Sequence, residues 1–233
     1  MRVTLIQEPK DILSTMWTAA RTCYSALSTE ELDDLVHSAI NEHKLNLISK
    51  VLESGHLSIA EHVVFTFGID YVSRSLTHQL VRHRLCTFSQ QSQRYVNFSD
   101  KEFHYVIPES IRANEELSKD YKELMTRIKD FYDKAVANEI KAEDARYVLP
   151  NAACTNIVVT TNLRNLMHMA NLRLCTRAQW EIREVFKSMV KEVTENNPWL
   201  KQYLQPTCEI QGFCTEHNCC GRKPKLDKGD AND

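Results

Sequence analysis

The stretch that decides the fold is VVFTFGIDYV, Val63–Val72. Its alternate residues from Val63 to Tyr71 are apolar, and the stretch is rich in β-branched and aromatic side chains, which predicts a strand with one buried face. A second run of this kind, TNIVVT at residues 155–160, predicts another strand. The chain is therefore expected to contain a β-sheet.

Helices are predicted on both sides of these strands. Ser28 and Glu31 have the spacing of a capping box, so a helix is expected from about residue 29 to 53, with Gly55 ending it. Further helices are expected at 73–84, 110–139, 143–149, 162–174 and 178–195, and short strands at 94–98 and 103–107 around a turn at Ser99–Asp100. Because helices outnumber strands and do not alternate strictly with them, the sequence predicts an α+β fold.

Glycine is scarce, and this excludes two kinds of phosphate site. The 233 residues include only 5 glycines, of which Gly55 and Gly68 alone precede residue 212. A dinucleotide-binding Gly-x-Gly-x-x-Gly loop or a P-loop cannot be written with them. A phosphorylated ligand would have to be held by side chains instead of by a glycine-rich backbone loop.

Charge and hydropathy describe an ordinary globular protein. The formal net charge is −2, which argues mildly against general binding of duplex nucleic acid. No apolar run approaches the length of a membrane span, and the opening MRVTLIQEPKD does not resemble a secretory signal. We therefore expect a cytoplasmic protein without a membrane partner.

The densest polar segment is QLVRHRLCTFSQQSQRY, Gln79–Tyr95, which contains arginine, histidine, glutamine and serine but no acidic residue. Arginine binds phosphate bidentately, and glutamine can both donate to and accept from a base edge. A solvent-exposed helix face would normally mix lysine and acidic residues into such a run. The composition favours a nucleotide site built from side chains.

A second basic group follows in Arg146, Arg164, Arg173, Arg177 and Arg183. On a helix that begins near Asn162, Arg164 and Arg173 would point in opposite directions, at about 100° per residue. If both contact ligands, one helix serves two sites, as happens at an interface between subunits. The alternative is ordinary surface arginines.

The segment ESGHLSIAEH, with His56, Glu61 and His62, lacks the His-Glu-x-x-His spacing of a zinc protease. We interpret it as a structural or substrate-shaping cluster in preference to a set of ligands. Cys86 and Cys175 lie near arginines, but neither has a general base beside it in sequence, so covalent catalysis by cysteine is not expected.

Four of the eight cysteines, Cys208, Cys214, Cys219 and Cys220, lie after Pro206. With His217 they could form a zinc site, but their spacing matches no common zinc finger. We therefore predict free thiols and no metal site.

Several segments together resemble the flavin-dependent thymidylate synthases. One motif of the resemblance is Arg82-His83-Arg84, followed after seven residues by Ser92. The others are the blocks ESGHLSIAEHVVFTF, ARYVLP, NLRNLMHMANLR and AQWEIR, which occur in that order. The resemblance covers residues 1–205 as one synthase domain and leaves 206–233 as a Cys-rich, partly flexible tail. It implies a central, largely antiparallel sheet flanked by helices, and a homotetramer whose active sites lie between subunits.

The resemblance also implies the reaction. Such enzymes methylate dUMP to dTMP with 5,10-methylenetetrahydrofolate as carbon donor and FAD, reduced by NADPH, as hydride source. The substrates are small molecules, and no nucleic acid is expected as a partner. The absence of an obvious nucleophilic cysteine agrees with such a cofactor-based reaction.

Residue roles carry over by motif. The catalytic residue is expected to be Arg173, whose guanidinium would stabilise the charge that forms as N3 of the uracil ionises. Flavin contacts are expected from Ser58 of a neighbouring subunit and from Arg82, His83, Arg84, Gln90, Asn162, Leu163, Arg164 and His168. Contacts to dUMP are expected from Gln79, Leu80, Val81, Arg82, Gln90, Gln91, Ser92, Gln93, Arg94, Arg146 and Arg173.

This chain departs from the family pattern at a few positions. Gln90 would make a neutral flavin contact where some members have Glu, Gln91 stands where an apolar residue is commoner, and His168 stands where Asn is common. Arg177 replaces a His of some members, which leaves a folate role for it in doubt.

The sequence leaves two alternative functions open. An RNA or single-strand binding module could use Phe88 or Tyr95 as stacking platforms. A flavin-free nucleotide hydrolase would need a metal-holding acidic cluster, but Asp100 is the only acidic residue between 75 and 100.

Overall fold

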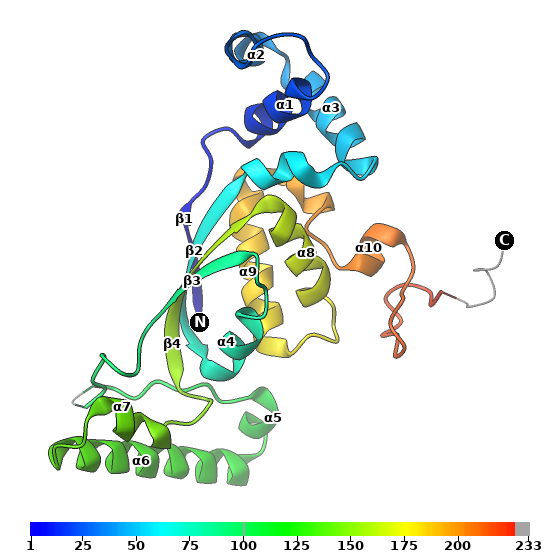
Figure 1. Cartoon of the computed structure of the whole chain (residues 1–233). Coiled ribbons are helices and arrows are strands. Elements are labelled where there is room, and N and C mark those ends of the chain that lie inside the picture. Colours follow the sequence, from blue (N-terminus) through cyan, green and yellow to red (C-terminus); the bar gives the residue numbers. More distant parts are fainter. Residues whose placement is uncertain (100, 227–233) are drawn as a thin grey trace. The chain divides into compact units, whose positions relative to one another are not determined.

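The computed structural model describes residues 1–99 and 101–226. The strands are β1 (Arg2–Gln7), β2 (Val64–Ser73), β3 (Cys86–Gln90) and β4 (Cys154–Asn162). They form one sheet in the order β1-β2-β4-β3 (Figure 1). The α-helices are α1 (Ile12–Thr22), α2 (Thr29–Ser38), α3 (Asn41–Glu53), α4 (Arg74–Leu80), α5 (Glu109–Arg112), α6 (Glu115–Ala137), α7 (Ala142–Ala145), α8 (Leu163–Arg173), α9 (Trp180–Asn196) and α10 (Thr207–Gln211). Short 3₁₀ helices are η1 (Leu57–His62), η2 (Arg146–Val148) and η3 (Pro198–Gln202). The predicted α+β class and antiparallel sheet are confirmed.

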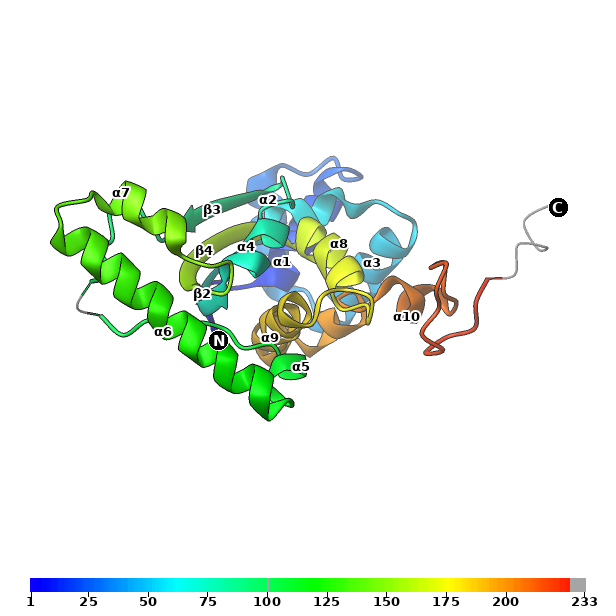
Figure 2. The same cartoon turned by 90° about the horizontal axis from the view of Figure 1, so that it is seen from below.

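The chain divides into two compact units, and strands β2 and β4 run from one into the other. The first unit comprises residues 1–3, 68–84 and 88–159, and the second comprises 4–67, 85–87 and 160–233. In the first unit, α5 and α7 lie at opposite ends of the long helix α6 (Figures 1 and 2). In the second unit, α1 contacts α2 and α3, and α8 contacts η1 and α9.

The two strands expected from their alternation are present. Phe65, Phe67 and Ile69 of β2 are completely buried, as the pattern predicts. The alternation ends at Tyr71, which is 47% exposed and has a left-handed φ of 57°. The backbone N–H of Tyr71 donates to Oδ1 of Asn156 on β4 at 3.1 Å. A side chain therefore replaces a backbone hydrogen bond between the strands at this bend.

The predicted helix from 29 to 53 is wrong in one respect, since it is two helices, α2 and α3. The capping box of Ser28 and Glu31 is present, and Gly55 follows α3 with a φ of 84°. In an unbroken helix, the buried Leu32 and Ile48 would point about 160° apart, at about 100° per residue. The extended break at Ala39 and Ile40 lets both α2 and α3 pack on α1.

The strands predicted at 94–98 and 103–107 are also wrong. Apart from a single bridge between Tyr105 and Ala153, these residues form irregular loop. Side chains of α6 satisfy their backbone instead, because Tyr132 accepts from the N–H of Phe98 at 3.3 Å and Tyr121 donates to the carbonyl of Val106 at 3.0 Å. Asp100 of the predicted turn lies outside the described residues.

The other helices match closely. The range 110–139 holds α5 and α6, which are separated by the capping residue Asn114, and 143–149 corresponds to α7 and η2. The two predicted for 162–174 and 178–195 are α8 and α9. Strands β1 and β3 were not predicted, because their side chains do not alternate clearly between apolar and polar.

Helix α1 begins at a charged cap that provides a test of stability. Oδ1 of Asp11 accepts from the backbone N–H of Ser14 at 2.8 Å, and its Oδ2 accepts from the Ser14 hydroxyl at 2.5 Å. The buried Lys44 donates to that hydroxyl at 3.1 Å. Burial raises the pKa of Asp11, but the bonds from Ser14 and the charge of Lys44 outweigh it, so its pKa is lowered overall.

We expect Asp11→Ala to reduce the free energy of unfolding by about 1 kcal/mol at pH 7, the usual loss for an N-cap. Because the pKa of Asp11 is lower in the folded than in the unfolded protein, its ionised carboxylate stabilises the folded state. This stabilisation is fully present at pH values above the unfolded pKa of about 3.9. The difference from wild type should therefore disappear as pH falls through the folded pKa. Urea unfolding at pH 7 and pH 3 measures this, with exposed Asp34→Ala as the control. An equal loss at both pH values would contradict the charged-cap interpretation.

Candidate functional site

Helix α4 leads into the segment that is richest in predicted site residues. Ser73 caps it by accepting from the N–H of Leu76 at 3.0 Å. The helix ends at Leu80 rather than at the predicted Arg84, because the N–H groups of Arg82 and His83 bond back to the carbonyls of Gln79 and Leu80 as the chain turns toward β3.

This turn presents its two arginines to the surface. Arg82 and Arg84 are exposed, while His83 between them is buried. Val81 is exposed and Gln79 is half-buried, but Leu80 is completely buried. Any contact between Leu80 and a ligand would therefore have to come from its backbone.

The loop from Gln90 to Arg94 is held by hydrogen bonds on several sides. Gln90 donates to the Thr77 hydroxyl at 3.0 Å, and the N–H of Gln91 donates to the carbonyl of Asn156 at 2.9 Å. The carbonyl of Gln91 accepts from Nη2 of Arg74 at 2.9 Å, and the Ser92 hydroxyl accepts from the N–H of Arg94 at 3.1 Å. These bonds give the loop a defined shape in the first unit.

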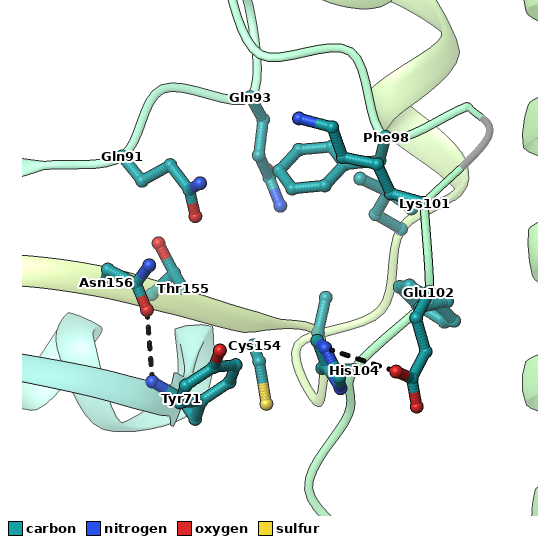
Figure 3. Close-up of a pocket in the computed structure, with 13 residues that line it drawn as sticks. Tyr71, Gln91, Gln93, Phe98, Lys101, Glu102, His104, Cys154, Thr155 and Asn156 are labelled. Atoms are coloured by element: carbon teal, nitrogen blue, oxygen red, sulfur yellow. Dashed lines mark hydrogen bonds and ion pairs between the residues drawn. The ribbon is translucent and has the colours of Figure 1, made fainter. Parts of the chain in front are cut away.

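A cavity of about 230 Å³ lies on one side of this loop (Figure 3). The side chains of Gln91 and Gln93 face Thr155 and Asn156 of β4 across it. The left-handed Tyr71 lies at its floor and packs edge-on against His104, with 5.2 Å between ring centroids. The polar side chain of Gln91 therefore points into the space behind the loop.

Three arginines of the first unit lie close to the loop or to Glu143, and we call Arg74, Arg94 and Arg146 the arginine cluster. Nη2 of Arg94 lies 3.3 Å from Oε2 of Glu143, and Nε of Arg146 donates to the carbonyl of Glu143 at 3.1 Å. Burial, together with the positive charge of Arg146, lowers the pKa of Arg74. Nε of Arg74 is buried without a hydrogen-bond partner.

The chemistry of the arginine cluster suits a dianion. Only Arg94 of these three arginines pairs with a carboxylate, that of Glu143, and the buried Nε of Arg74 has no acceptor. Buried donors are rarely left unsatisfied, so a ligand oxygen or a water is expected near Nε of Arg74. Arg94 and Arg146 were predicted to bind the nucleotide, whereas Arg74 was missed because it stands outside the motifs and reads as the first residue of a helix.

The second unit holds another cavity, of about 630 Å³, that brings together predicted flavin residues. It is lined by Leu57, Glu61, Leu85, Asn162, Arg164, Asn165, Met167, His168 and Asn171. Glu61 of η1 forms an ion pair with Nη1 of Arg164 at the start of α8. The predicted Ser58 is exposed beside the lining residue Leu57, and Leu163 is buried in the core.

Asn162 and Asn165 fix the start of α8 in this cavity. Asn162 caps the helix by accepting from the N–H of Asn165 at 2.9 Å. The buried amide of Asn165 donates to the carbonyl of Leu85 at 3.3 Å and to the Thr161 hydroxyl at 2.9 Å. The same network contains Cys86, whose pKa is raised by burial, so this thiol stays protonated near pH 7. The Cys86 thiol is therefore poorly suited to nucleophilic attack.

Arg173 is the last residue of α8 and is half-buried. Burial lowers its pKa, although a guanidinium stays protonated at neutral pH. Arg164, on the same helix, is exposed. Arg177 and Arg183 have structural partners, because Nε of Arg177 lies 3.4 Å from Oε2 of Glu216 and Arg183 donates to the carbonyl of Thr176 at 2.8 Å.

The predicted site residues thus fall into two sets. The residues expected to bind the nucleotide belong to the first unit, except for Arg173, while those expected to bind the flavin are divided between the units. Glu61, Glu143 and Arg74 are brought to these sets by tertiary contacts. The sequence predicts a structural or substrate-shaping role for Glu61, and its ion pair with Arg164 places it at the lining of the 630 Å³ cavity.

The described residues lack both a metal-binding cluster and a helix that could span a membrane. In residues 1–99 and 101–226, no group of three or more His, Cys, Asp or Glu side chains is arranged to hold a metal ion. No helix in that part of the chain has the length and apolarity needed to cross a membrane.

Comparison with known proteins gives consistent matches along the chain. The model of the family described as "Thymidylate synthase complementing protein" matches residues 4–199. A flavin-dependent thymidylate synthase from Geobacter sulfurreducens is 39% identical over 227 residues, which cover 97% of this chain and 96% of that protein. Proteins with the same name from Pyrococcus furiosus and Nitratidesulfovibrio vulgaris are 40% and 42% identical and cover 94% and 96% of this chain and 91% and 95% of their own lengths.

Proposed function

Since this chain belongs to the family of flavin-dependent thymidylate synthases, we propose that it is an enzyme that converts dUMP to dTMP by reductive methylation. The observation that carries this proposal is the family match over residues 4–199. That match sets aside the alternatives of a nucleotide hydrolase and an RNA-binding module.

The first unit supplies a phosphate site in this proposal. The arginine cluster would bind the phosphate of dUMP. Its three positive charges exceed the single negative charge of Glu143, and Nε of Arg74 has no hydrogen-bond acceptor. The loop from Gln90 to Arg94 and residues 79–82 would hold the nucleoside. Arginines take the place of the glycine-rich loops that this chain lacks.

The second unit offers a donor set that fits a flavin nucleotide. The 630 Å³ cavity combines apolar surfaces of Leu57, Leu85 and Met167 with amide, guanidinium and imidazole groups of Asn162, Arg164 and His168. We propose FAD as this group, with Ser58, Arg82, His83, Arg84, Gln90 and Leu163 as its further contacts. When bound and reduced by NADPH, the flavin supplies the hydride, and methylenetetrahydrofolate supplies the carbon.

The protein's own part in the reaction is to hold and polarise the uracil. Arg173 would place a partly desolvated positive charge beside the pyrimidine and stabilise the anion formed when N3 loses its proton. The negative charge on the ionised uracil would make C5 a better nucleophile toward the one-carbon unit. Cys86 takes no part, because its pKa is raised by burial.

We also propose that the protein acts in the cytoplasm as a homotetramer with active sites shared between subunits. Arg164 and Arg173 point in opposite directions on α8, so one helix can contribute to two sites. A molar mass of about four chains in light scattering tests this, and a monomer that is fully active would contradict it.

The proposed activity is tested by tritium release from C5-labelled dUMP. Release should require NADPH and reduced flavin, and dTMP should form only when methylenetetrahydrofolate is added. Protein that neither contains nor binds a flavin, or that forms dTMP without one, would overturn the proposal.

Glu143 provides a prediction about affinity for the nucleotide. Its carboxylate holds Arg94 in the place where the phosphate is proposed to bind, so it competes with the ligand. We expect Glu143→Gln to lower the KM for dUMP about two- to fivefold with little change in kcat, because exposed ion pairs are worth up to about 1 kcal/mol. The neighbouring exposed residue Asp144→Asn is the matched control. A raised KM would indicate that Glu143 instead orders the arginines for binding.

A further inference from the structure

Five of the eight cysteines gather near the C-terminal end of the second unit and have no part in the proposed reaction. Four of them, Cys175, Cys208, Cys214 and Cys220, line one cavity of about 160 Å³. Cys219 is next to Cys220 in the chain and is half-buried. These five cysteines are free thiols.

The tail carries these thiols on a folded segment. The backbone of Cys214 accepts from the N–H of Leu226 at 3.0 Å and donates to the carbonyl of Pro224 at 2.7 Å. Glu209 of α10 lies 3.7 Å from Nε of Arg222 and 3.1 Å from Nζ of Lys223. These contacts hold residues 222–226 against Cys214 and α10.

Cys208 and Cys220 are brought together by this arrangement. Cys208 precedes Glu209, and Cys220 precedes Arg222 by two residues, so the ion pair of Glu209 and Arg222 joins the two segments that carry these cysteines. Both thiols line the same cavity, and each lies close enough to Arg222 for its charge to act on both sulfur atoms.

The two thiols differ in a way that suits a sequential reaction. Hydrogen bonds from the Thr176 hydroxyl and the N–H of Arg222, with the charge of Arg222, lower the pKa of the exposed Cys220. Burial and the Glu209 carboxylate raise the pKa of the half-buried Cys208. Cys220 is thus the better and more accessible nucleophile, and Cys208 is a protonated neighbour in the same cavity.

We propose that Cys208 and Cys220 form a redox-active dithiol site that is oxidised to a disulfide by low-molecular-weight disulfides. The Cys220 thiolate attacks one sulfur of the oxidant, forms a mixed disulfide and releases one thiolate. Cys208 then loses its proton and attacks the Cys220 sulfur, which forms the protein disulfide and releases the second thiol. The protein dithiol loses two electrons, and the oxidant is reduced to two thiols.

The experiment treats the reduced full-length protein with oxidised glutathione, blocks the remaining thiols with an alkylating reagent and digests it with trypsin and a glutamate-specific protease. Cleavage after Lys201, Glu209, Glu216 and Arg222 separates Cys208 from Cys220. We expect one linked species that joins residues 202–209 to 217–222, lighter by about two daltons than the two separate fragments.

Serine variants assign the pair. Cys220→Ser should abolish the linked species, whereas Cys219→Ser and the distant, exposed Cys23→Ser should retain it. Cys208→Ser should stop at the mixed disulfide between Cys220 and glutathione. A linkage to residues 210–216, a linked species that persists in Cys220→Ser, or thiols protected from alkylation by bound zinc would each overturn the proposal. None of these measurements depends on thymidylate synthase activity.

Discussion

Replacing Arg173 with alanine is expected to abolish dTMP formation while the protein keeps its flavin. The residue ends α8 and is half-buried, and burial lowers its pKa without removing its charge at neutral pH. A partly desolvated cation stabilises a developing anion more strongly than one in water. Loss of such a group usually lowers kcat by about 10²–10³-fold, and we expect at least this for Arg173→Ala.

The measurement is turnover of dUMP in the tritium assay, alongside flavin absorbance of the purified variant. Arg127→Ala is the matched control, because Arg127 is exposed on α6 and is not one of the predicted site residues. Added guanidinium should restore part of the activity of Arg173→Ala but leave Arg127→Ala unchanged. Turnover near the wild-type value would refute the catalytic assignment, and loss of flavin would move Arg173 to the flavin site.

Replacing Arg146 with alanine is expected to raise the KM for dUMP by about 10²-fold. Arg146 contributes one guanidinium of the arginine cluster, and charge-assisted bonds to phosphate are about twice as strong as neutral ones. Its removal also leaves Glu143 facing Arg94 alone, which reduces the net positive charge at the proposed phosphate site. The effect on kcat should be smaller, because the phosphate does not react.

Deoxyuridine, which lacks the phosphate, makes this prediction specific. Wild type and Arg146→Ala should use the nucleoside equally poorly, while Arg127→Ala should match wild type with both substrates. The comparison forms a thermodynamic cycle between the side chain and the phosphate. If Arg146→Ala impairs deoxyuridine as much as dUMP, Arg146 acts on the base or the fold instead.

The secondary structure that could be predicted had a strong local signal. The alternation in Val63–Val72 and the apolar spacing in 162–174 located β2 and α8, because burial of one face depends on the period of the chain alone. The break between α2 and α3 could not be predicted, since it follows from the need of both helices to pack on α1. The segments 94–98 and 103–107 resemble strands in sequence because aromatic residues are common in strands. Their irregular structure depends on hydrogen bonds from α6, which the local sequence does not reveal.

By itself, the sequence determined the family, the α+β class and the segments that carry the candidate site. Short motifs and residue composition can be recognised without knowing which residues are in contact. It also predicts that phosphates are held by arginine side chains, since five glycines cannot form the backbone loops that would otherwise bind them. Only the tertiary structure decided the partners: Glu143 and Arg74 beside Arg94 and Arg146, Glu61 on Arg164, and Cys208 near Cys220. The physical reason is that charge pairing and burial act through space between residues far apart in the chain, and neither is encoded in local spacing.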